Sequence, residues 1–333
     1  MHAFKLDPRD EYPHPADPTP IFNESVYVNG FDNGSGVGGW MRLGNRANEG
    51  YAELSVCLYL PDGRIACQFQ RPKILDNARF DAGNLSFDVA EPFRQIDASF
   101  TGEVMLVDDP AALNDPQSLF QTAPRAPCEV RWACEAASPI HGGRPVSDDQ
   151  QTMYGRDFSL NHFNQHTKVG GSITVGDDRW AFDGHGWRDH SWGPRIWQVI
   201  YSYRLFLANL GDGRGFMLLK ITDGHGHSRR VGVLMVDGQY EDILDLDVTT
   251  RWDAKGDPRT ASIGVRTAAR TALIEAEMLT VAPLRNRRKA GDEMLISRIW
   301  ESSTRFRWDG GEGLGMSEYI ERLDDGRLPG EPI

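Results

Sequence analysis

The 333-residue sequence is short of cysteine, of long apolar runs and of positive charge, and each shortage excludes a class of protein. The four cysteines form no C-x-x-C pair, which predicts buried thiols in a reducing cytoplasm rather than a disulfide framework or a zinc site. No apolar run could span a membrane, and the proline-rich start, MHAFKLDPRDEYPHPADPTP, has no signal-peptide core. The net charge of −12 disfavours nucleic acid and anionic lipid. We therefore expect a cytoplasmic protein without nucleic-acid or membrane partners.

Long helical patterns and a usable nucleotide motif are also missing. The stretch GSGVGG, residues 34–39, fits G-x-G-x-x-G, but the residues after it contain more glycine and show no helical period. A dinucleotide phosphate needs a helix N-terminus at that point. His162 and His166 are four residues apart in a β-rich segment, which places them on one strand face about 13 Å apart, too far for one metal ion. We expect neither a metal nor another cofactor.

Strand signals dominate the chain instead. The segments YAELSVCLYLPDGRIACQFQ (51–70), GGSITVGDDRWAFDG (170–184) and YRLFLANLGDGRGFMLLKIT (203–222) each place a Gly/Asp turn between two β-rich runs. Many short strands with such turns predict an all-β fold of two tandem β-barrels, with short helices in the connections. We expect an extended arm at residues 1–20, one barrel over 21–155 and a second barrel over 156–333.

The stretch FDGHGWRDHSWGPRIW, residues 182–197, concentrates tryptophan, histidine, arginine and aspartate. In a strand, alternation puts Trp187 and Asp189 on one face with His185 and Ser191, and Arg188, His190 and Trp192 on the other. Gly184 and Gly186 flank His185 and permit a bulge or a close approach of another backbone.

Two interpretations of this stretch remain open on chemical grounds. Further aromatic residues follow it in the sequence, namely Trp197, Tyr201, Tyr203 and Phe206. A barrel with such a lining would hold an apolar ligand, with aspartate and histidine as its few polar groups. Alternatively, Arg188 and Arg195 would pair with Asp189 in a buried network that braces two sheets.

The sequence GWRDHSWGPRIW resembles the G-x-R-D-H-S-W-G-x-R-x-W element of the superfamily that includes carotenoid 1,2-hydratase (hydroxyneurosporene synthase). Three other stretches are similar to the same proteins: NESVYVNGFD with GVGGWMRLGNRANEGYAEL, NHFNQHTKVGGSITVG and GLGMSEYIER. The resemblance covers most of residues 20–325. It implies two lipocalin-like (calycin) barrels with an apolar cleft, the second barrel carrying the signature.

The same resemblance implies roles for individual residues. In the hydratase branch an aspartic acid protonates a double bond, aromatic rings stabilise the cation and water adds. Carried over, Asp189 would be the proton donor, with His185 or His190 orienting the acid or the water. The substrate would contact aromatic residues that we expect to be Trp187, Trp192, Trp197, Tyr201, Tyr203 and Trp40. A supporting network would consist of Arg188, Arg195, Glu318 and Tyr319.

One departure from the family pattern concerns the residues Phe163-Asn164-Gln165, where relatives usually carry Tyr-Glu-Gln. The chain therefore lacks the carboxylate that relatives carry at residue 164. To act as a proton donor, the carboxylic acid of Asp189 must stay protonated. A neighbouring cation favours the ionised form, so the mechanism requires Arg188 to point away from Asp189.

These observations predict a cofactor-independent hydratase or lyase that acts by acid–base catalysis on an apolar small molecule, such as a terpenoid, a steroid or an aromatic compound. The alternative is a lipocalin-like carrier of a hydrophobic ligand that performs no chemistry. A homodimer is compatible with either function.

Overall fold

The computed structural model describes residues 4–290 and 292–323, and nearly all of its regular structure is β-strand. The helices are single short segments between strands, as the sequence predicts: η1 Pro8–Glu11, η2 Ala47–Glu49, η3 Pro110–Asn114, α1 Pro116–Thr122 and η4 Trp197–Val199. None of the described helices has the length and apolar character needed to cross a bilayer. The all-β prediction is confirmed.

The chain divides into two compact units. Unit 1 comprises Met1–Pro61, Ala66–Leu106 and Pro124–Ile196, and unit 2 comprises Asp62–Ile65, Val107–Ala123 and Trp197–Ile333. The division thus falls after Ile196 and not at residue 155, where the sequence led us to expect it. The reason is strand pairing, because the hairpin that carries the signature pairs with N-terminal strands and completes their sheet.

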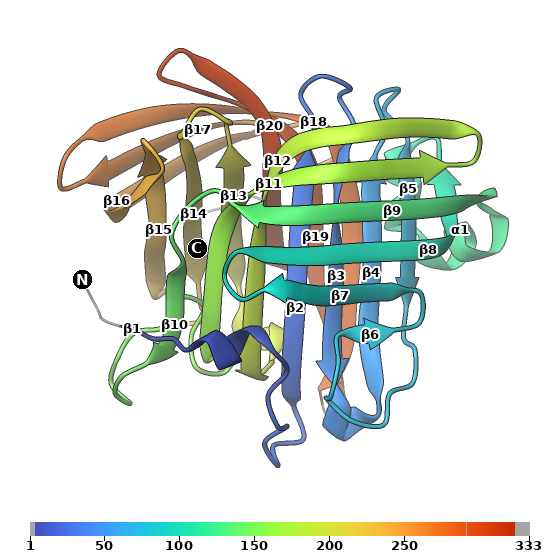
Figure 1. Ribbon diagram of the computed structural model, residues 1–333, viewed down its shortest axis with the longest axis horizontal. Coiled ribbons are helices and arrows are strands. Elements are labelled where there is room, and N and C mark those ends of the chain that lie inside the picture. The colour runs from blue at the N-terminus through green and yellow to red at the C-terminus, as the bar shows by residue number, and fades with distance from the viewer. Residues whose placement is uncertain (1–3, 291, 324–333) are drawn as a thin grey trace. The chain divides into compact units, whose positions relative to one another are not determined.

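Unit 1 contains one large sheet (Figure 1). Its strands are β1 Phe4–Lys5, β2 Phe22–Phe31, β3 Gly38–Arg46, β4 Tyr51–Tyr59, β5 Ile65–Gln70, β6 Asp81–Ala82, β7 Leu85–Glu91, β8 Gln95–Val107, β9 Arg125–Ala136, β10 His141–Pro145, β11 Asn161–Val175 and β12 Asp178–Pro194. They are ordered β1-β10-β11-β12-β2-β3-β4-β5-β8-β7-β6, and β9 pairs with both β11 and β8. The pairings from β11 through β2 and β8 to β9 therefore close into a ring, as in a barrel.

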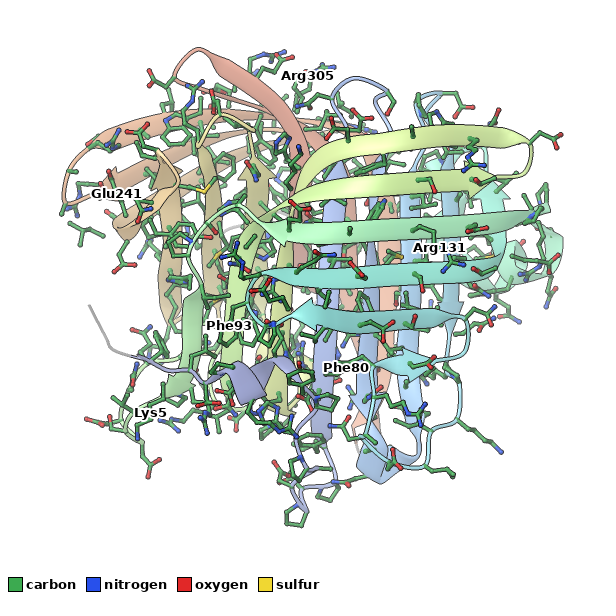
Figure 2. The ribbon with its side chains drawn as sticks, in the orientation of Figure 1. Lys5, Phe80, Phe93, Arg131, Glu241 and Arg305 are labelled. Carbon is green, nitrogen blue, oxygen red and sulfur yellow. The ribbon has the colours of Figure 1, made fainter. Side chains whose placement is uncertain are left out.

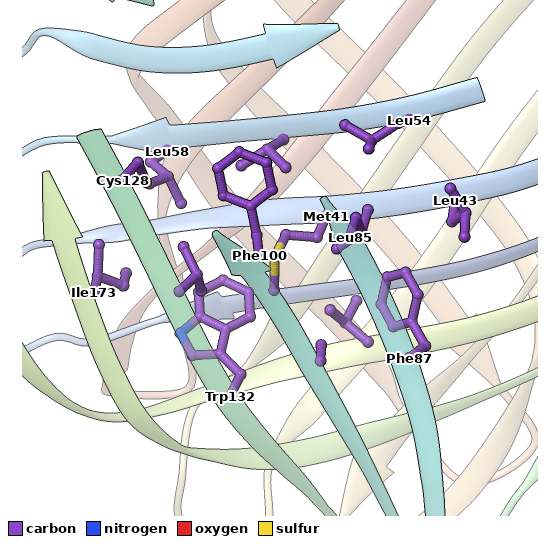
Figure 3. Packing of buried hydrophobic residues seen from close by; sticks show 14 of the residues in the cluster. Met41, Leu43, Leu54, Leu58, Leu85, Phe87, Phe100, Cys128, Trp132 and Ile173 are labelled. Atoms are coloured by element: carbon purple, nitrogen blue, oxygen red, sulfur yellow. The ribbon is translucent and has the colours of Figure 1, made fainter. Parts of the chain in front are cut away.

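The core of unit 1 lies where β7, β8 and β9 cross the strands β2, β3 and β4 (Figures 1 and 3). Alternate residues of β2, β3 and β4, such as Met41 and Leu43 on β3, point into this core, which also contains Phe100 and Trp132. These side chains are buried, and each contributes about 1.5–3 kcal/mol of transfer free energy. The opposite faces of β2, β3, β11 and β12 are free to carry polar residues.

Unit 2 is a closed eight-stranded barrel. Its strands are β13 Ser202–Asn209, β14 Gly215–Thr222, β15 Ser228–Val236, β16 Gln239–Trp252, β17 Pro258–Thr267, β18 Thr271–Ala290, β19 Glu293–Trp308 and β20 Gly311–Arg322. Aromatic rings fill its core: Phe216 meets Phe306 edge-on at 5.1 Å, and Phe206 meets Tyr319 at 5.8 Å. The barrel is a packed structure around these side chains.

Cys57, Cys67, Cys128 and Cys134 are buried and no disulfide joins them, as their spacing predicts. Burial raises the pKa of Cys67, Cys128 and Cys134 to about 12. They serve as small apolar residues of unit 1.

Candidate functional site

Strand β12 separates two sets of polar residues by simple alternation. Arg188 and His190 project to one side of the sheet, where Glu11 and Glu24 bind them. Asp189 projects to the other side, where its nearest ionisable partner is His162. The predicted alternation along residues 185–192 is therefore observed.

The face that carries Asp189 is organised as cross-strand rows. In the register of the sheet Asn164, Asp189, Tyr27 and Arg42 lie side by side on β11, β12, β2 and β3. Directly opposed residues in antiparallel strands have Cβ atoms about 4.5–5.5 Å apart. The rows on either side contribute further polar and aromatic residues, and we call the whole set the Asp189 face: His162, Asn164, His166, Trp187, Asp189, Ser191, Ser25, Tyr27, Asn29, Trp40 and Arg42.

The closest pair of ionisable groups on this face is Asp189 and His162. Asp189 Oδ2 lies 3.8 Å from His162 Nε2, and the aspartate side chain is 20% exposed whereas the histidine is 5% exposed. His162 Nδ1 lies 3.4 Å from the Asn164 amide nitrogen, and Tyr154 meets the imidazole edge-on at 4.8 Å. The histidine is thus held in place, and the carboxylate retains some access.

Arginines lie near Asp189 without forming an ion pair with it in the described part of the chain. Arg195 donates to Ser191 Oγ at 2.8 Å and stacks over Phe158 at 4.4 Å. Burial lowers the pKa of Arg195 to about 10, and the charge of Arg42 acts in the same direction, while Asp189 opposes it. Among the described residues no arginine forms an ion pair with Asp189, so the guanidinium brace that the sequence left open is not found around that carboxyl.

Aromatic surface adjoins the row of Asp189. Trp187 and Trp40 are buried, Trp40 lies parallel to Tyr27 at 6.1 Å, and His166 meets Trp187 edge-on at 4.6 Å. The indole N–H of Trp40 is buried without a hydrogen-bond partner in the described part of the chain. Such a donor on a polar face is a group that a ligand oxygen could accept from.

The other face of β12 binds the N-terminal arm. Arg188 makes two contacts with the carboxylate of Glu11, at 2.5 and 3.1 Å, and also donates to Gln165 Oε1. Glu11 additionally accepts from the backbone N–H of Phe93, a residue labelled in Figure 2. Both ionic side chains are nearly fully buried, at 2% and 4% exposure. Arg188 thus binds the arm on the side of β12 that faces away from Asp189.

A second polar group on this side joins the arm to β2 and β12; we call Asp10, His14, Glu24 and His190 the arm cluster. Glu24 Oε1 lies 2.6 Å from His14 Nδ1 and 2.8 Å from His190 Nε2. Burial would raise the pKa of Glu24, but hydrogen bonds from both histidines and their charges hold it at about 2.

Rings enclose the arm cluster. Trp192 stacks on His14 at 4.1 Å, and Phe80, labelled in Figure 2, meets His190 edge-on at 5.1 Å. Burial would lower the pKa of His14, yet the nearby carboxylates of Glu24 and Asp10 raise it above the usual value.

The remaining predicted residues are dispersed. His185 is four strand positions from Asp189, about 13 Å away, and His190 and Trp192 point to the arm side. Of the substrate-contacting residues predicted, only Trp187 and Trp40 share the Asp189 face. Trp197, Tyr201 and Tyr203 belong to unit 2, as do Glu318 and Tyr319 of the predicted supporting network.

Within unit 2, Tyr319 lies inside the barrel and shares a hydrogen bond of 2.9 Å with Thr250. Burial raises its pKa to about 12, with Arg204 acting in the opposite direction. Glu318, the preceding residue of β20, is only partly buried. The tyrosine is therefore a core residue of unit 2.

Sequence reasoning missed His162 as an acid–base group and missed the acidic residues of the arm. His162 was considered only as a metal ligand paired with His166. Glu24 stands inside the stretch NESVYV that carries part of the family resemblance, which was the one available signal. Glu11 and His14 sit in an irregular proline-rich segment with no periodic pattern.

Comparisons with known proteins agree on fold and family. The family described as domain of unknown function (DUF7064) matches residues 7–322. No curated protein sequence matches the chain. The solved structures with this fold include an AttH-like protein from Nitrosomonas europaea, at 16% identity and a TM-score of 0.58, which covers 91% of this chain and 94% of its own. They also include CghA with Sch210972, at 11% identity and a TM-score of 0.60, with 97% of each chain covered.

Proposed function

The chain belongs to the DUF7064 family and has the tandem lipocalin-like fold of the carotenoid 1,2-hydratase-like superfamily, and from that premise we propose that it is a cofactor-independent hydratase or lyase. Its substrate is an apolar small molecule with a carbon–carbon double bond or an alcohol, of terpenoid, steroid or aromatic type. The Asp189 face provides the acid–base groups and part of the aromatic contact surface.

The observation that carries this proposal is the position of Asp189. It is a partly accessible carboxyl in an aromatic and polar row, with a histidine at 3.8 Å and no arginine partner among the described residues. A carboxyl and an imidazole at this distance can share one proton through a small movement or a single water molecule. A guanidinium in that place would fix the carboxylate in its charged form.

In this mechanism the Asp189–His162 pair delivers a proton to one carbon of the double bond. The neighbouring carbon becomes cationic and faces the ring of Trp187 or Tyr27, whose π electrons stabilise positive charge. Water adds to that carbon and returns a proton to the pair, so the net change is the addition of one H and one OH. Dehydration follows the same steps in reverse.

Asn164 gives this site its own character. It lies directly opposite Asp189 in the register of β11 and β12, at the position where relatives usually carry a carboxylate. With an amide there, Asp189 is the single carboxyl of its row. The Oδ1 atom of Asn164 is buried without a hydrogen-bond partner in the described structure. We infer that residue 164 contributes to substrate choice in this protein.

The test compares Asp189→Asn with the matched control Asp183→Asn, which changes a carboxyl that is 84% exposed on the same strand. Extracts containing terpenoid, steroid and aromatic compounds are incubated with each protein, and products that gain or lose one water are followed by mass spectrometry. We expect turnover by the wild type and by Asp183→Asn, and a loss of about 100-fold or more in Asp189→Asn. Undiminished turnover in Asp189→Asn would refute the assignment.

The alternative function is that of a carrier, and it is favoured by the 3.8 Å separation, which is longer than a hydrogen bond. CghA has been crystallised with Sch210972, so the fold accommodates a bound compound in that protein. A carrier would retain a compound from the same extract through purification and release it unchanged. In that case Asp189→Asn alters ligand affinity or the melting temperature, and no water is gained or lost.

A further inference from the structure

The arm cluster is a group of ligand atoms that the acid–base proposal does not use. Among the described residues His14, Glu24 and His190 bring one donor atom each within 4.8 Å of one another. They come from three separate parts of unit 1, namely the arm after η1, strand β2 and strand β12. We propose that the arm cluster binds a divalent transition-metal ion of the Zn²⁺ class.

The donor set suits such an ion. Two imidazoles and one carboxylate form the ligand set of many sites that keep a fourth position for water. His14 is 17% exposed whereas Glu24 is fully buried, so the fourth position is on the side of His14. Nitrogen donors favour zinc, copper, nickel or iron over magnesium and calcium, which prefer oxygen alone.

Two of the three ligand-atom spacings are shorter than those of a tetrahedral site, and all three atoms lie within 4.8 Å of one another. Ligand atoms about 2.0–2.1 Å from a zinc ion are about 3.3 Å apart at tetrahedral angles. Glu24 Oε1 lies 2.6 Å from His14 Nδ1 and 2.8 Å from His190 Nε2. An opening of roughly half an ångström, which side-chain rotation supplies, admits an ion in place of the bridging protons.

Supporting groups orient the ligands from behind. The second ring nitrogen of His14 lies 3.1 Å from Asp10 Oδ1, which is the carboxylate–histidine arrangement that fixes a metal-binding tautomer. Glu24 Oε2 accepts from the backbone N–H of His14 at 2.9 Å and from the Asn77 amide. These bonds leave Oε1 as the atom that faces both imidazoles.

The two imidazoles of the arm cluster are already directed at one point. Two imidazoles converge on one carboxylate oxygen, and His190 Nδ1 is buried with no hydrogen-bond partner in the described part of the chain. Side chains that already converge lose little freedom when an ion replaces the protons between them. A bound ion would tie the arm to β2 and β12 at a single point.

The experiment uses the untagged full chain after treatment with a chelator. Zn²⁺ is titrated in by calorimetry in the presence of excess Mg²⁺, and Co²⁺ is added separately to record the visible absorption of a tetrahedral site. The variants are His14→Ala, which removes a half-buried ligand, Asp10→Asn, which removes only the supporting carboxylate, and the control His227→Ala, whose imidazole is 82% exposed beside Asp223.

We expect one Zn²⁺ per chain, no competition from Mg²⁺ and no change in His227→Ala. Asp10→Asn should weaken binding about 10- to 100-fold, and His14→Ala should weaken it further. The proposal is overturned if the wild type binds no Zn²⁺, or if His14→Ala binds it as tightly as the wild type. Should His14→Ala fail to fold, the Co²⁺ spectrum of the wild type decides, because absence of tetrahedral bands excludes the site.

Discussion

The buried pair of Arg188 and Glu11 makes a quantitative prediction about how the arm is held. Glu11→Gln removes the countercharge of the Arg188 guanidinium, whose side chain is 4% exposed, and leaves it only neutral acceptors such as the Gln165 oxygen. The backbone N–H of Phe93 also exchanges an anionic acceptor for a neutral one. Removing one partner of such a pair destabilises by about 3–5 kcal/mol, because the remaining charge is buried and uncompensated.

Urea unfolding followed by circular dichroism measures the global effect, and trypsin sensitivity at Arg9 measures local release of the arm. The control is Glu129→Gln on β9, whose partner Arg131 is 58% exposed, and we expect a change below about 1 kcal/mol there. The double variant Glu11→Leu with Arg188→Met should lose less than the sum of the single changes. The reasoning is refuted if Glu11→Gln behaves like Glu129→Gln in both assays.

Three further predictions concern unit 1. Gly186→Ala should destabilise by about 1–3 kcal/mol in thermal unfolding, since a Cβ there would lie 1.9 Å from a backbone oxygen, whereas Gly170→Ala meets nothing within 4 Å and should be neutral. Burial would raise the pKa of Glu53, but Arg42 and Arg46 lower it, so the ionised carboxylate stabilises the fold above its unfolded pKa. The loss of unfolding free energy in Glu53→Gln should therefore shrink below a pH of about 4.3, and a loss that stays constant there would contradict the pairing with the two arginines. Native protein at pH 8 should resist iodoacetamide, because a pKa of about 12 leaves roughly one thiol in ten thousand ionised, and rapid labelling would contradict the burial of Cys67, Cys128 and Cys134.

The strand content and the local hairpins were accessible from sequence because their signals are local. The turn residues at 61–63 and 176–178 predict the hairpins β4–β5 and β11–β12, and both hairpins form where expected. Alternation also predicted that Arg188 and Asp189 point to opposite faces. These inferences need only neighbouring residues.

The allocation of the signature to a barrel was not accessible in the same way. It depends on the pairing of β12 with β2, for example Asp189 with Tyr27, and nothing local in either segment specifies its partner. The partners of Arg188 and His190 were hidden for a related reason, because they lie in or next to an arm whose backbone is irregular. The spacing of His162 and His166 along one strand likewise could not reveal the arm cluster, because its residues come from three separate segments.

Mutations at even-numbered and odd-numbered residues of strand β12 should therefore have different effects. Changes at 188, 190 and 192 act on the arm through Glu11, Glu24 and His14, so they should alter stability, proteolysis and metal binding. Changes at 187 and 189 act on the opposite face, so they should alter turnover or ligand affinity while the arm stays docked. Under the proposed function, the RDH sequence divides between the arm and the Asp189 face, because consecutive side chains in a strand point to opposite faces. A catalytic defect in His190→Asn as large as that of Asp189→Asn, in a protein whose arm remains protected from trypsin, would contradict this division.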